Sequence, residues 1–578
     1  MGEPEFDLRS VPFSRYGSYF AFSILPGIPG RAEGLFLRSV HGDAGDGGAL
    51  FRVELLREGV PVPSRIRASA SLLQLEDGDA VVEICLPEPG CIRFRGTGAG
   101  LRLQVDQGPS EYDCAVDHGG GRWHVSSFTH RIESAARSLS GTLRVDSPWL
   151  DVRSEYVILD FLPGVDSPVP APVPVPVPVP IMEGIVIEAV DDRLQGNDPE
   201  PAFDECVQKV RDEIRAWQAR FGDGARLSPG TRELAAYVLW SSVVAPGGHF
   251  GRPAMLMSKN WMCQVWSWDH CFNALALAPG HPDLAWDQLM VLFDQQRPDG
   301  RLPDSVSDRL VRWDFAKPPI HGWALRKMMA QPGLVSAERL QEVYEPLCRH
   351  TRWWFECRDD DHDGLPQYNH GNDSGWDNGT TFLGGLPVET PDLAAFLVIQ
   401  LDTLSEAARR LGRVGESTEW GRKRDALLPL LIERFWRKDR FVALRAADHQ
   451  VVDTDSLLPL VPLVLGRRLP PAVAMALVGR LRERFLTAHG LATEWPKSER
   501  YVPDGYWRGP VWAPSTYLIV DGLVDLGEKE LAREISLRFV AMAGRSGMAE
   551  NFDALTGSGL RDRAYTWTAS VVLLLMAP

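Results

Sequence analysis

The stretch PAFDECVQKVRDEIRAWQARF, residues 201–221, is where the pattern of the chain changes and its fold is decided. Apolar residues recur in it every three or four positions, which places them on one face of an amphipathic helix. These residues are Phe203, Val207, Val210, Ile214, Trp217 and Phe221.

Helical segments continue from this point to the C-terminus, separated by loops rich in Gly, Pro, Asp and Trp. A long series of paired helices with elaborate loops favours a helical toroid over a compact bundle. An α-solenoid is the alternative, but no repeat of fixed period is visible. The segments lie near 231–244, 282–296, 338–356, 391–411, 418–436, 471–486, 513–526 and 528–543.

The first 195 residues follow a different pattern. Short β-type runs, such as AVVEI at 80–84 and YVILD at 156–160, are broken by Gly, Asp and Pro. This pattern predicts an N-terminal β-sandwich domain over 1–195. The proline-valine run at 168–180 lacks every second amide donor, which predicts an extended polyproline II spacer. It lies either within the β domain or between the domains.

Composition argues against several functions and partners. The formal net charge is −16, from 61 basic and 77 acidic residues, and no long basic run occurs, so nucleic acid and anionic membranes are not expected partners. No stretch approaches the roughly 18 apolar residues of a membrane span, and the acidic start is unlike a signal peptide. We therefore expect a cytoplasmic protein. The charge does not indicate an oligomeric state.

Cysteine and tryptophan usage adds two expectations. The eight cysteines are scattered without a CxxC pair, which predicts free thiols rather than a zinc or disulfide framework. All but Trp123 and Trp149 of the 19 tryptophans lie after residue 200, many in loops. A flat indole flanked by polar side chains suits the apolar face of a sugar ring. About half of these tryptophans fit core or loop anchoring equally well.

Two polar, glycine-rich loops carry carboxylates suited to catalysis. NHGNDSGWDNG at 369–379 contains Asp377, and GMAENFDALTG at 547–557 contains Glu550. Glycoside hydrolysis needs one protonated and one ionised carboxyl group, whose surroundings push their pKa values apart. From the residues alone, Asp377 also fits a turn or cap and Glu550 a solvated charge at a helix end.

A set of segments resembles a known family. SWDHCF at 267–272, SGWDN at 374–378 and YWRGPVW at 506–512, with ENFD at 550–553, resemble glycoside hydrolase family 63 and the related trehalases and glucosidases in order and spacing. The resemblance covers about 200 to 578. It implies a mainly α protein, in which an (α/α)6-barrel glycosidase domain over 196–578 follows the N-terminal β-sandwich domain in the sequence.

The resemblance also implies roles for individual residues. Asp377 matches the general acid and Glu550 the general base of an inverting reaction, with carboxyl groups about 6.5 to 9.5 Å apart. Trp268 and Asp269 match the lining of the nonreducing-end sugar pocket, where the aspartate accepts hydrogen bonds from hydroxyls. Arg508 alternatively fits a structural ion pair. The remaining residues expected to bind substrate are Gln295, Trp323, Trp376, Asn378, Arg508 and Trp512.

The segment DDDHDG at 359–364 has the spacing of a calcium loop. Asp359, Asp361 and Asp363 supply alternate carboxylates, and Gly364 permits a sharp turn. The twelfth position is His370 rather than Glu, which excludes an EF-hand. Some similar enzymes bind calcium there, so a structural calcium site is a candidate and a solvated turn is the alternative.

The expected function is hydrolysis of an α-glucoside, which is a short oligosaccharide, a disaccharide or a small glucoside such as glucosylglycerate. A small carbohydrate is the expected partner. No cofactor is expected, because the sequence has no Gly-rich phosphate loop, HExxH or GxSxG segment. The alternatives are a mannosyl-specific hydrolase of the same barrel and a noncatalytic carbohydrate-binding protein, which would be marked by loss of a carboxylate.

Overall fold

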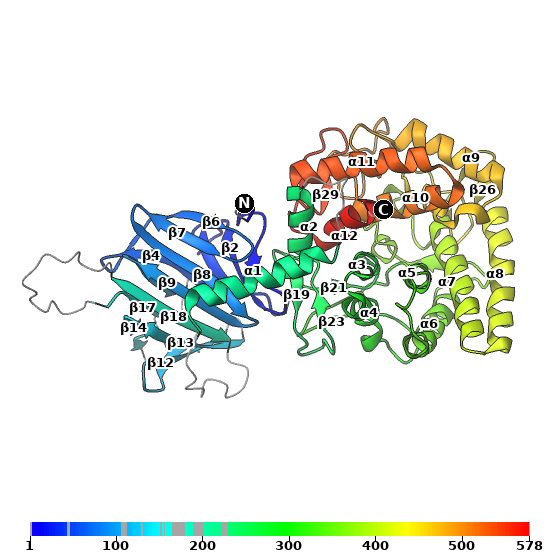
Figure 1. Ribbon diagram of the computed structural model, residues 1–578. Helices are drawn as coiled ribbons and strands as arrows, with labels where there is room; N and C mark the ends of the chain where they lie inside the picture. Colours follow the sequence, from blue (N-terminus) through cyan, green and yellow to red (C-terminus); the bar gives the residue numbers. More distant parts are fainter. Residues whose placement is uncertain are drawn as a thin grey trace, which may run out of the picture. The chain divides into compact units, whose positions relative to one another are not determined.

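Two compact units make up the protein (Figure 1). The β-rich unit contains Met1–Ala219, Trp240–Ala245 and Ser258–Cys263, and the helical unit contains Arg220–Leu239, Pro246–Met257 and Gln264–Pro578. The computed structural model describes residues 3–42, 47–105, 113–128, 131–150, 153–154, 156–164, 180–188, 201–221 and 229–576. The predicted domain boundary at 195/196 and nearly all of the predicted spacer at 168–180 lie outside these residues.

The β-rich unit is built from two antiparallel sheets. The first has the order β1 (Phe13–Ser14), β2 (Phe20–Leu25), β3 (Gly34–Ser39), β4 (Ala49–Arg57), β10 (Gly100–Gln104), β17 (Ile158–Leu162) and β14 (Thr142–Asp146), with β5 (Val60–Val62) on β4. The second has the order β11 (Cys114–Asp117), β12 (Arg122–Ser127), β13 (Ile132–Ser140), β18 (Ile181–Glu188), β9 (Cys91–Thr97), β8 (Ala80–Glu88), β7 (Leu73–Asp77) and β6 (Arg65–Ala68).

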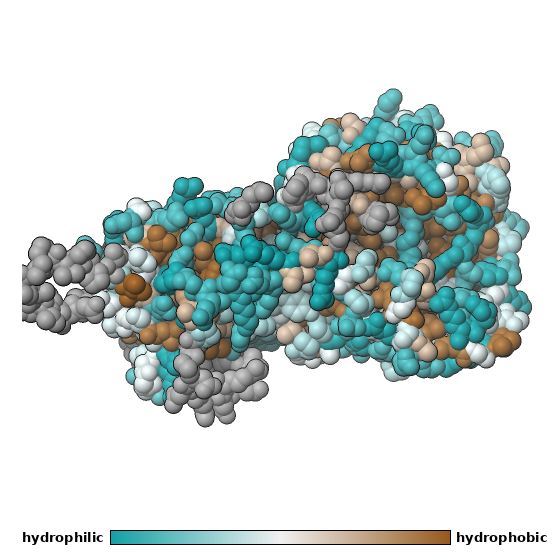
Figure 2. Space-filling view, viewed as in Figure 1, coloured by the Kyte–Doolittle hydropathy of each residue, from teal (hydrophilic) through white to brown (hydrophobic). Residues whose placement is uncertain are grey.

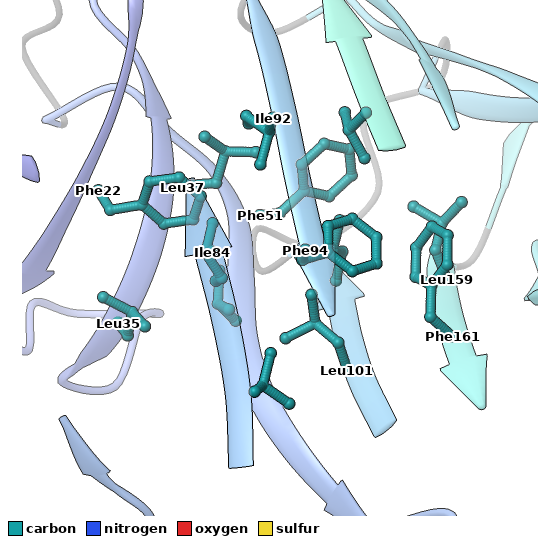
Figure 3. Packing of buried hydrophobic residues seen from close by; sticks show 14 of the residues in the cluster. Phe22, Leu35, Leu37, Phe51, Ile84, Ile92, Phe94, Leu101, Leu159 and Phe161 are labelled. Atoms are coloured by element: carbon teal, nitrogen blue, oxygen red, sulfur yellow. The ribbon is translucent and has the colours of Figure 1, made fainter. Parts of the chain in front are cut away.

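One hydrophobic core joins the two sheets. Phe51 and Leu101 from the first sheet and Ile84 from the second belong to it (Figure 3). Successive residues of a strand face opposite sides of its sheet, so each strand contributes side chains to this core. Phe94 of β9 meets Phe161 of β17 edge to face, with ring centroids 4.5 Å apart.

Helix α1 (Phe203–Ala219) belongs to the β-rich unit, although its residues open the helical part of the sequence. Its predicted apolar face packs against β8 and β9, with Phe203, Cys206 and Val207 in a cluster with Cys85. Arg95 of β9 forms two hydrogen bonds to Asp204 in the first helical turn. An acidic residue at a helix N-terminus also suits the helix dipole.

The helical unit contains six segments that contact one another in a closed cycle. Each packs against the next, and the last packs against the first. They are α3 (Asp269–Leu277), α5 (His321–Met329), α7 (Pro391–Arg410), η5 (Leu458–Arg468), α10 (Ala513–Leu526) and α12 (Thr566–Met576).

Two glycines bring neighbouring members of this cycle close together. A Cβ atom on Gly322 of α5 would lie 2.6 Å from the Gln400 Cα atom of α7. A Cβ atom on Gly522 of α10 would lie 2.0 Å from the Leu463 carbonyl oxygen of η5. Since Cβ atoms do not approach other atoms so closely, glycine is required for this packing.

A second group of helices packs on the outside of the cycle. The pair α7 and α8 is visible in Figure 1. Helix α4 packs on α3, α6 and α8 on α7, α9 on η5, and α11 on α10 and α12. The predicted helical segments correspond to α2 (Pro229–Ser242), α4 (Pro282–Met290), α6 (Ala337–Cys357), α7, α8 (Val414–Phe435), α9 (Pro471–Arg480), α10 and α11 (Lys529–Ser546).

The protein is therefore mainly α with a β-rich N-terminal region. The face seen in Figure 2 is largely hydrophilic on both units, with hydrophobic residues scattered among polar ones. Among the described residues, no helix has the length and apolar character needed to span a membrane.

Candidate active site

Asp377 lies in a turn between two 3-10 helices, η3 (Gly371–Ser374) and η4 (Thr380–Phe382). Gly375 ends η3 with a φ of 71°, in the left-handed region that glycine tolerates. A Cβ atom there would also lie 2.5 Å from the Trp268 ring. The Ser-Gly-Trp-Asp sequence thus lets the chain turn against Trp268 before it presents Asp377.

Asp373 holds this loop in shape. Its buried carboxylate accepts hydrogen bonds from the backbone amides of Ala316 at 2.8 Å, Asn369 at 2.9 Å and His370 at 3.1 Å. This carboxylate ties the Asp377 loop to the segment that carries Lys317.

Lys317 is the cation closest to Asp377. Its Nζ lies 3.9 Å from Asp377 Oδ1 and 3.3 Å from Asp304 Oδ1, and it donates a 2.7 Å hydrogen bond to the Asn372 carbonyl. Burial raises the pKa of Asp377; Lys317 opposes this shift, and Asp304 adds to it. A raised pKa keeps the carboxyl group protonated to higher pH, which is the state that a general acid needs.

Glu550 directly precedes strand β29 (Asn551–Phe552), and its side chain is 3% exposed. The Glu550 amide donates to the Asp562 carbonyl at 2.7 Å, and Trp567 Nε1 donates to the Glu550 carbonyl at 3.3 Å. Among the described residues, Glu550 Oε1 is buried without a hydrogen-bond partner. Glu550 is therefore not a solvated charge at a helix end.

The pKa of Glu550 is raised to about 7, mainly by burial and then by Asp562. Arg561 and a hydrogen bond from Tyr506 oppose the rise, and the charge of Asp377 adds to it. Burial and the charges of Glu550, Asp377 and Asp269 all raise the pKa of the Tyr506 hydroxyl. The structure therefore brings these carboxylates near one residue, although their loops are far apart in the sequence.

Asn378 connects two of the sequence segments. Its Nδ2 donates to the Gly505 carbonyl at 3.0 Å, and its Oδ1 accepts from the Trp507 amide at 3.0 Å. The ring centroids of Trp376 and Trp507 are 4.8 Å apart, and those of Trp268 and Trp507 are 6.3 Å apart. Asn378, Trp376 and Trp268 therefore lie together, and they brace the loop of Asp377.

Asp269 is the first residue of α3 and is buried beside the same group. Its Oδ2 has no hydrogen-bond partner among the described residues. Burial raises its pKa to about 8, while Lys317 opposes the rise. Near pH 7 the carboxyl group can therefore both donate and accept hydrogen bonds, which suits a sugar hydroxyl.

Four other residues expected to bind substrate lie in different surroundings. Trp512 has no exposed surface, and its ring stacks on that of Trp507 with centroids 4.0 Å apart. Its Nε1 donates a hydrogen bond to the Tyr506 carbonyl, so Trp512 supports the residues of the site. Trp323 packs against Phe272 and Tyr517, and its Nε1 donates to Asp521. Gln295 donates to the His249 carbonyl, and Arg508 donates to the Arg500 carbonyl. None of these four bonds reaches Asp377 or Glu550.

Lys317, Asp304, Tyr506 and Arg561 were not singled out from the sequence as site residues. Tyr506 lies inside the segment 506–512 that carries the family resemblance, and Lys317 lies six residues before Trp323, so the sequence pointed to their neighbourhood but not to their roles. Nothing in the sequence distinguishes Asp304 or Arg561 from other charged residues.

The sequence profile of the mannosylglycerate hydrolase MGH1-like glycoside hydrolase domain matches residues 262–568, more than half of the chain. The chain belongs to this family. It is a glycoside hydrolase, and the resemblance to glycoside hydrolase family 63 and related α/α-barrel glycosidases is confirmed. Glycoside hydrolases of this group need no cofactor.

Two similar relatives of this MGH1-like hydrolase act on glycerate glycosides, as their names state. The mannosylglycerate hydrolase of Thermus thermophilus is 24% identical over 387 residues, which are 53% of this chain and 93% of the relative. The glucosylglycerate hydrolase of Mycolicibacterium hassiacum is 24% identical over 405 residues, which are 54% of this chain and 91% of the relative.

Two solved structures show the fold. The glycoside hydrolase family 63 mannosylglycerate hydrolase of Thermus thermophilus in complex with glucose superposes with a TM-score of 0.52 and 21% identity, over 59% of this chain and 98% of that one. A bacterial glucoamylase complexed with acarbose superposes with a TM-score of 0.59 and 11% identity, over 100% of this chain and 95% of that one.

The predicted calcium loop of this MGH1-like hydrolase forms a different cluster from the one expected. Asp361, Asp363, Glu389 and His449 each offer a ligand atom, and these atoms lie within 4.8 Å of one another. Glu389 is fully buried, and neither of its oxygens has a hydrogen-bond partner among the described residues. Asp359 instead accepts from the amides of Asp363 and Gly364, so it shapes the turn and is replaced in the cluster by Glu389.

If calcium binds this cluster, it will stabilise the folded protein. We expect calcium to raise Tm by several degrees relative to chelator, because a ligand at 100 times its Kd contributes about 2.7 kcal/mol. Glu389→Gln should abolish this rise. Asp360→Asn is the matched control, since Asp360 bonds to Gln367 and stands outside the cluster. Equal Tm values with calcium and with chelator would exclude a stabilising site.

Proposed function

We propose that this protein is an inverting glycosidase that hydrolyses a small α-glycoside, with glucosylglycerate and mannosylglycerate as the first candidates. In this proposal, the closed cycle of six segments is the inner layer of an (α/α)6 barrel, the outer helices form its second layer, and the two sheets of the β-rich unit form a β-sandwich. The observation that carries the proposal is the pair of carboxyl groups, Asp377 and Glu550, which act electrostatically on each other and whose pKa values burial raises in both cases.

The two groups differ in their exposure and in the charge beside them. Asp377 is 30% exposed and lies beside Lys317, so it can reach a glycosidic oxygen from the open side. Glu550 is buried, with one oxygen available to accept a proton from water. In the proposed step, Asp377 gives its proton to the leaving oxygen as the glycosidic bond breaks. Glu550 removes a proton from water, whose oxygen bonds to the anomeric carbon from the opposite face.

The choice of glycerate glycosides rests on the names of the similar relatives. A second candidate substrate is a short α-glucooligosaccharide, because the glucoamylase structure matches the full chain, including the β-rich unit. A noncatalytic binding protein is disfavoured, since both carboxyl groups are present.

The test is hydrolysis of glucosylglycerate, mannosylglycerate, maltose and trehalose, followed by proton NMR of the released sugar. We expect one of them to release the β-anomer first, because inversion at an α-linkage gives a β-sugar. Initial release of the α-anomer would refute inversion. If the protein binds one of these sugars but cleaves none, the noncatalytic alternative gains support.

Asp269 offers a direct test of the sugar pocket. Asp269→Ala removes a buried hydrogen-bonding group and should lower kcat/KM by about 10-fold for each hydrogen bond lost, because a hydrogen bond of a largely neutral group contributes about 0.5–1.5 kcal/mol. Steady-state kinetics measure this effect. Asp283→Ala is the control, since Asp283 occupies the first turn of α4 as an exposed residue. Unchanged kcat/KM in Asp269→Ala would remove this residue from the pocket.

A further inference from the structure

Arg561 connects three segments around Glu550. Its Nη1 donates to Asn551 Oδ1 at 3.1 Å, directly beside Glu550 in sequence. It forms an ion pair with Asp504 Oδ1 at 2.7 Å, and its guanidinium lies 4.9 Å from the centroid of the Tyr506 ring. The Arg561 side chain thus contacts Asn551, which follows the proposed base, and Tyr506, which bonds to that base. It also contacts Asp504, which lies two residues before Tyr506.

The backbone at two of these contacts is unusual. Tyr506 has a φ of 63° and Arg561 a φ of 58°, both in the left-handed region that residues with a Cβ atom rarely adopt. Such conformations persist when surrounding contacts hold them, and they concentrate at functional sites. Here each of the two residues supplies a contact that holds the other.

The groups that face Glu550 come from several elements. Arg561 and the Tyr506 hydroxyl favour its ionised form, whereas Asp562 and Asp377 disfavour it, and Tyr565 is buried beside it. Arg561 is the only positive charge in this set. Its side chain is 31% exposed, whereas Glu550 is buried.

We infer that Arg561 is a positioning residue for the reaction, which holds Tyr506 and Asn551 in place beside Glu550 and thereby keeps the base ionised and correctly oriented. This inference rests on the proposed function of Glu550. It assigns Arg561 no contact with substrate.

The inference predicts a change in pH dependence. A general base works when ionised, so the acidic limb of kcat/KM reports its ionisation in the free enzyme. Removing a positive charge raises the pKa of a carboxyl group, which moves that limb to higher pH. If the limb moves by about one pH unit, kcat/KM of Arg561→Gln should be about tenfold lower than that of the wild type at pH values below the limb. At pH values above the limb, kcat/KM should fall by less than about threefold. Arg561→Lys keeps the charge and should hold the limb near its wild-type position.

The experiment measures pH profiles of kcat/KM for the full chain and for Arg561→Gln, Arg561→Lys and Tyr506→Phe, with circular dichroism to check folding. Arg409→Gln is the control, because Arg409 pairs with Glu406 at the exposed C-terminal end of α7. We expect the limb to move upward in Arg561→Gln and in Tyr506→Phe, which loses a hydrogen bond to the ionised base. A uniform loss at every pH, or an unchanged profile, in folded Arg561→Gln would overturn the inference while leaving the proposed function intact. Full activity in Glu550→Gln, or no cleavage by wild type, would instead overturn the proposed function and the inference with it.

Discussion

Replacing Glu550 by Gln should lower kcat by about 10³-fold, since general base catalysis contributes about 10²–10⁴-fold. Glutamine keeps the shape of the side chain and its bond with Tyr506 but cannot accept a proton from water. The variant should still bind substrate, so KM should change far less than kcat. Steady-state kinetics on the cleaved substrate, with equilibrium binding to the inactive variant, measure both effects.

The pH profile of the wild type provides a linked expectation. The pKa of Glu550 is raised to about 7, and the base is competent only when ionised. Activity should therefore rise as the pH increases through about 7. Asp553→Asn is the control for the substitution, because Asp553 lies in the same loop and bonds to the amides of Leu555 and Thr556. Glu550→Gln with wild-type kcat would exclude Glu550 as the base.

Replacing Asp377 by Asn should have an effect of similar size, about 10³-fold on kcat, with substrates whose leaving group needs protonation. The reason differs, because the lost group is a proton donor. Asp377→Asn should therefore cleave the matching α-glycosyl fluoride at a rate within about tenfold of wild type, since fluoride departs without a general acid.

This contrast separates the two carboxyl groups. Glu550→Gln should remain slow with the fluoride, since water still needs a base. Fluoride release can be followed with an ion-selective electrode. Asp299→Asn is the control, because Asp299 bonds to the backbone of Arg301 on an exposed loop. If Asp377→Asn is equally slow with both kinds of substrate, Asp377 has another role.

The sequence predicted the outer helices better than the inner ones, for a physical reason. Helix α6 has a polar side and a buried side that includes Leu340, Val343 and Leu347, so its period is visible. All nine residues of α3 are buried, from Asp269 to Leu277. A helix enclosed on every side has no contrast between polar and apolar faces, so periodicity cannot reveal it. The same applies to α12, which is apolar on nearly every face.

The site was predicted only in part. The segments around Trp268, Asp377 and Glu550 were identified because their order resembles a family, and contacts place Trp268, Trp376 and Asn378 around the Asp377 loop. The calcium loop was predicted with Asp359, whereas the cluster takes Glu389, whose strand β25 (Val388–Glu389) pairs with β24 (Gln367–Tyr368). Strand pairing of this kind cannot be deduced from the spacing of aspartates.

By itself, the sequence determined the change from β to α structure, the amphipathic helices, the family and the two loops that carry Asp377 and Glu550. These features depend on local period and on short segments, which a linear pattern contains. The tertiary structure alone decided that α1 packs on the β-rich unit, that Lys317 faces Asp377, and that Tyr506 and Arg561 surround Glu550. The protonation of each carboxyl group depends on burial and on charges brought from distant segments, and only folding creates both.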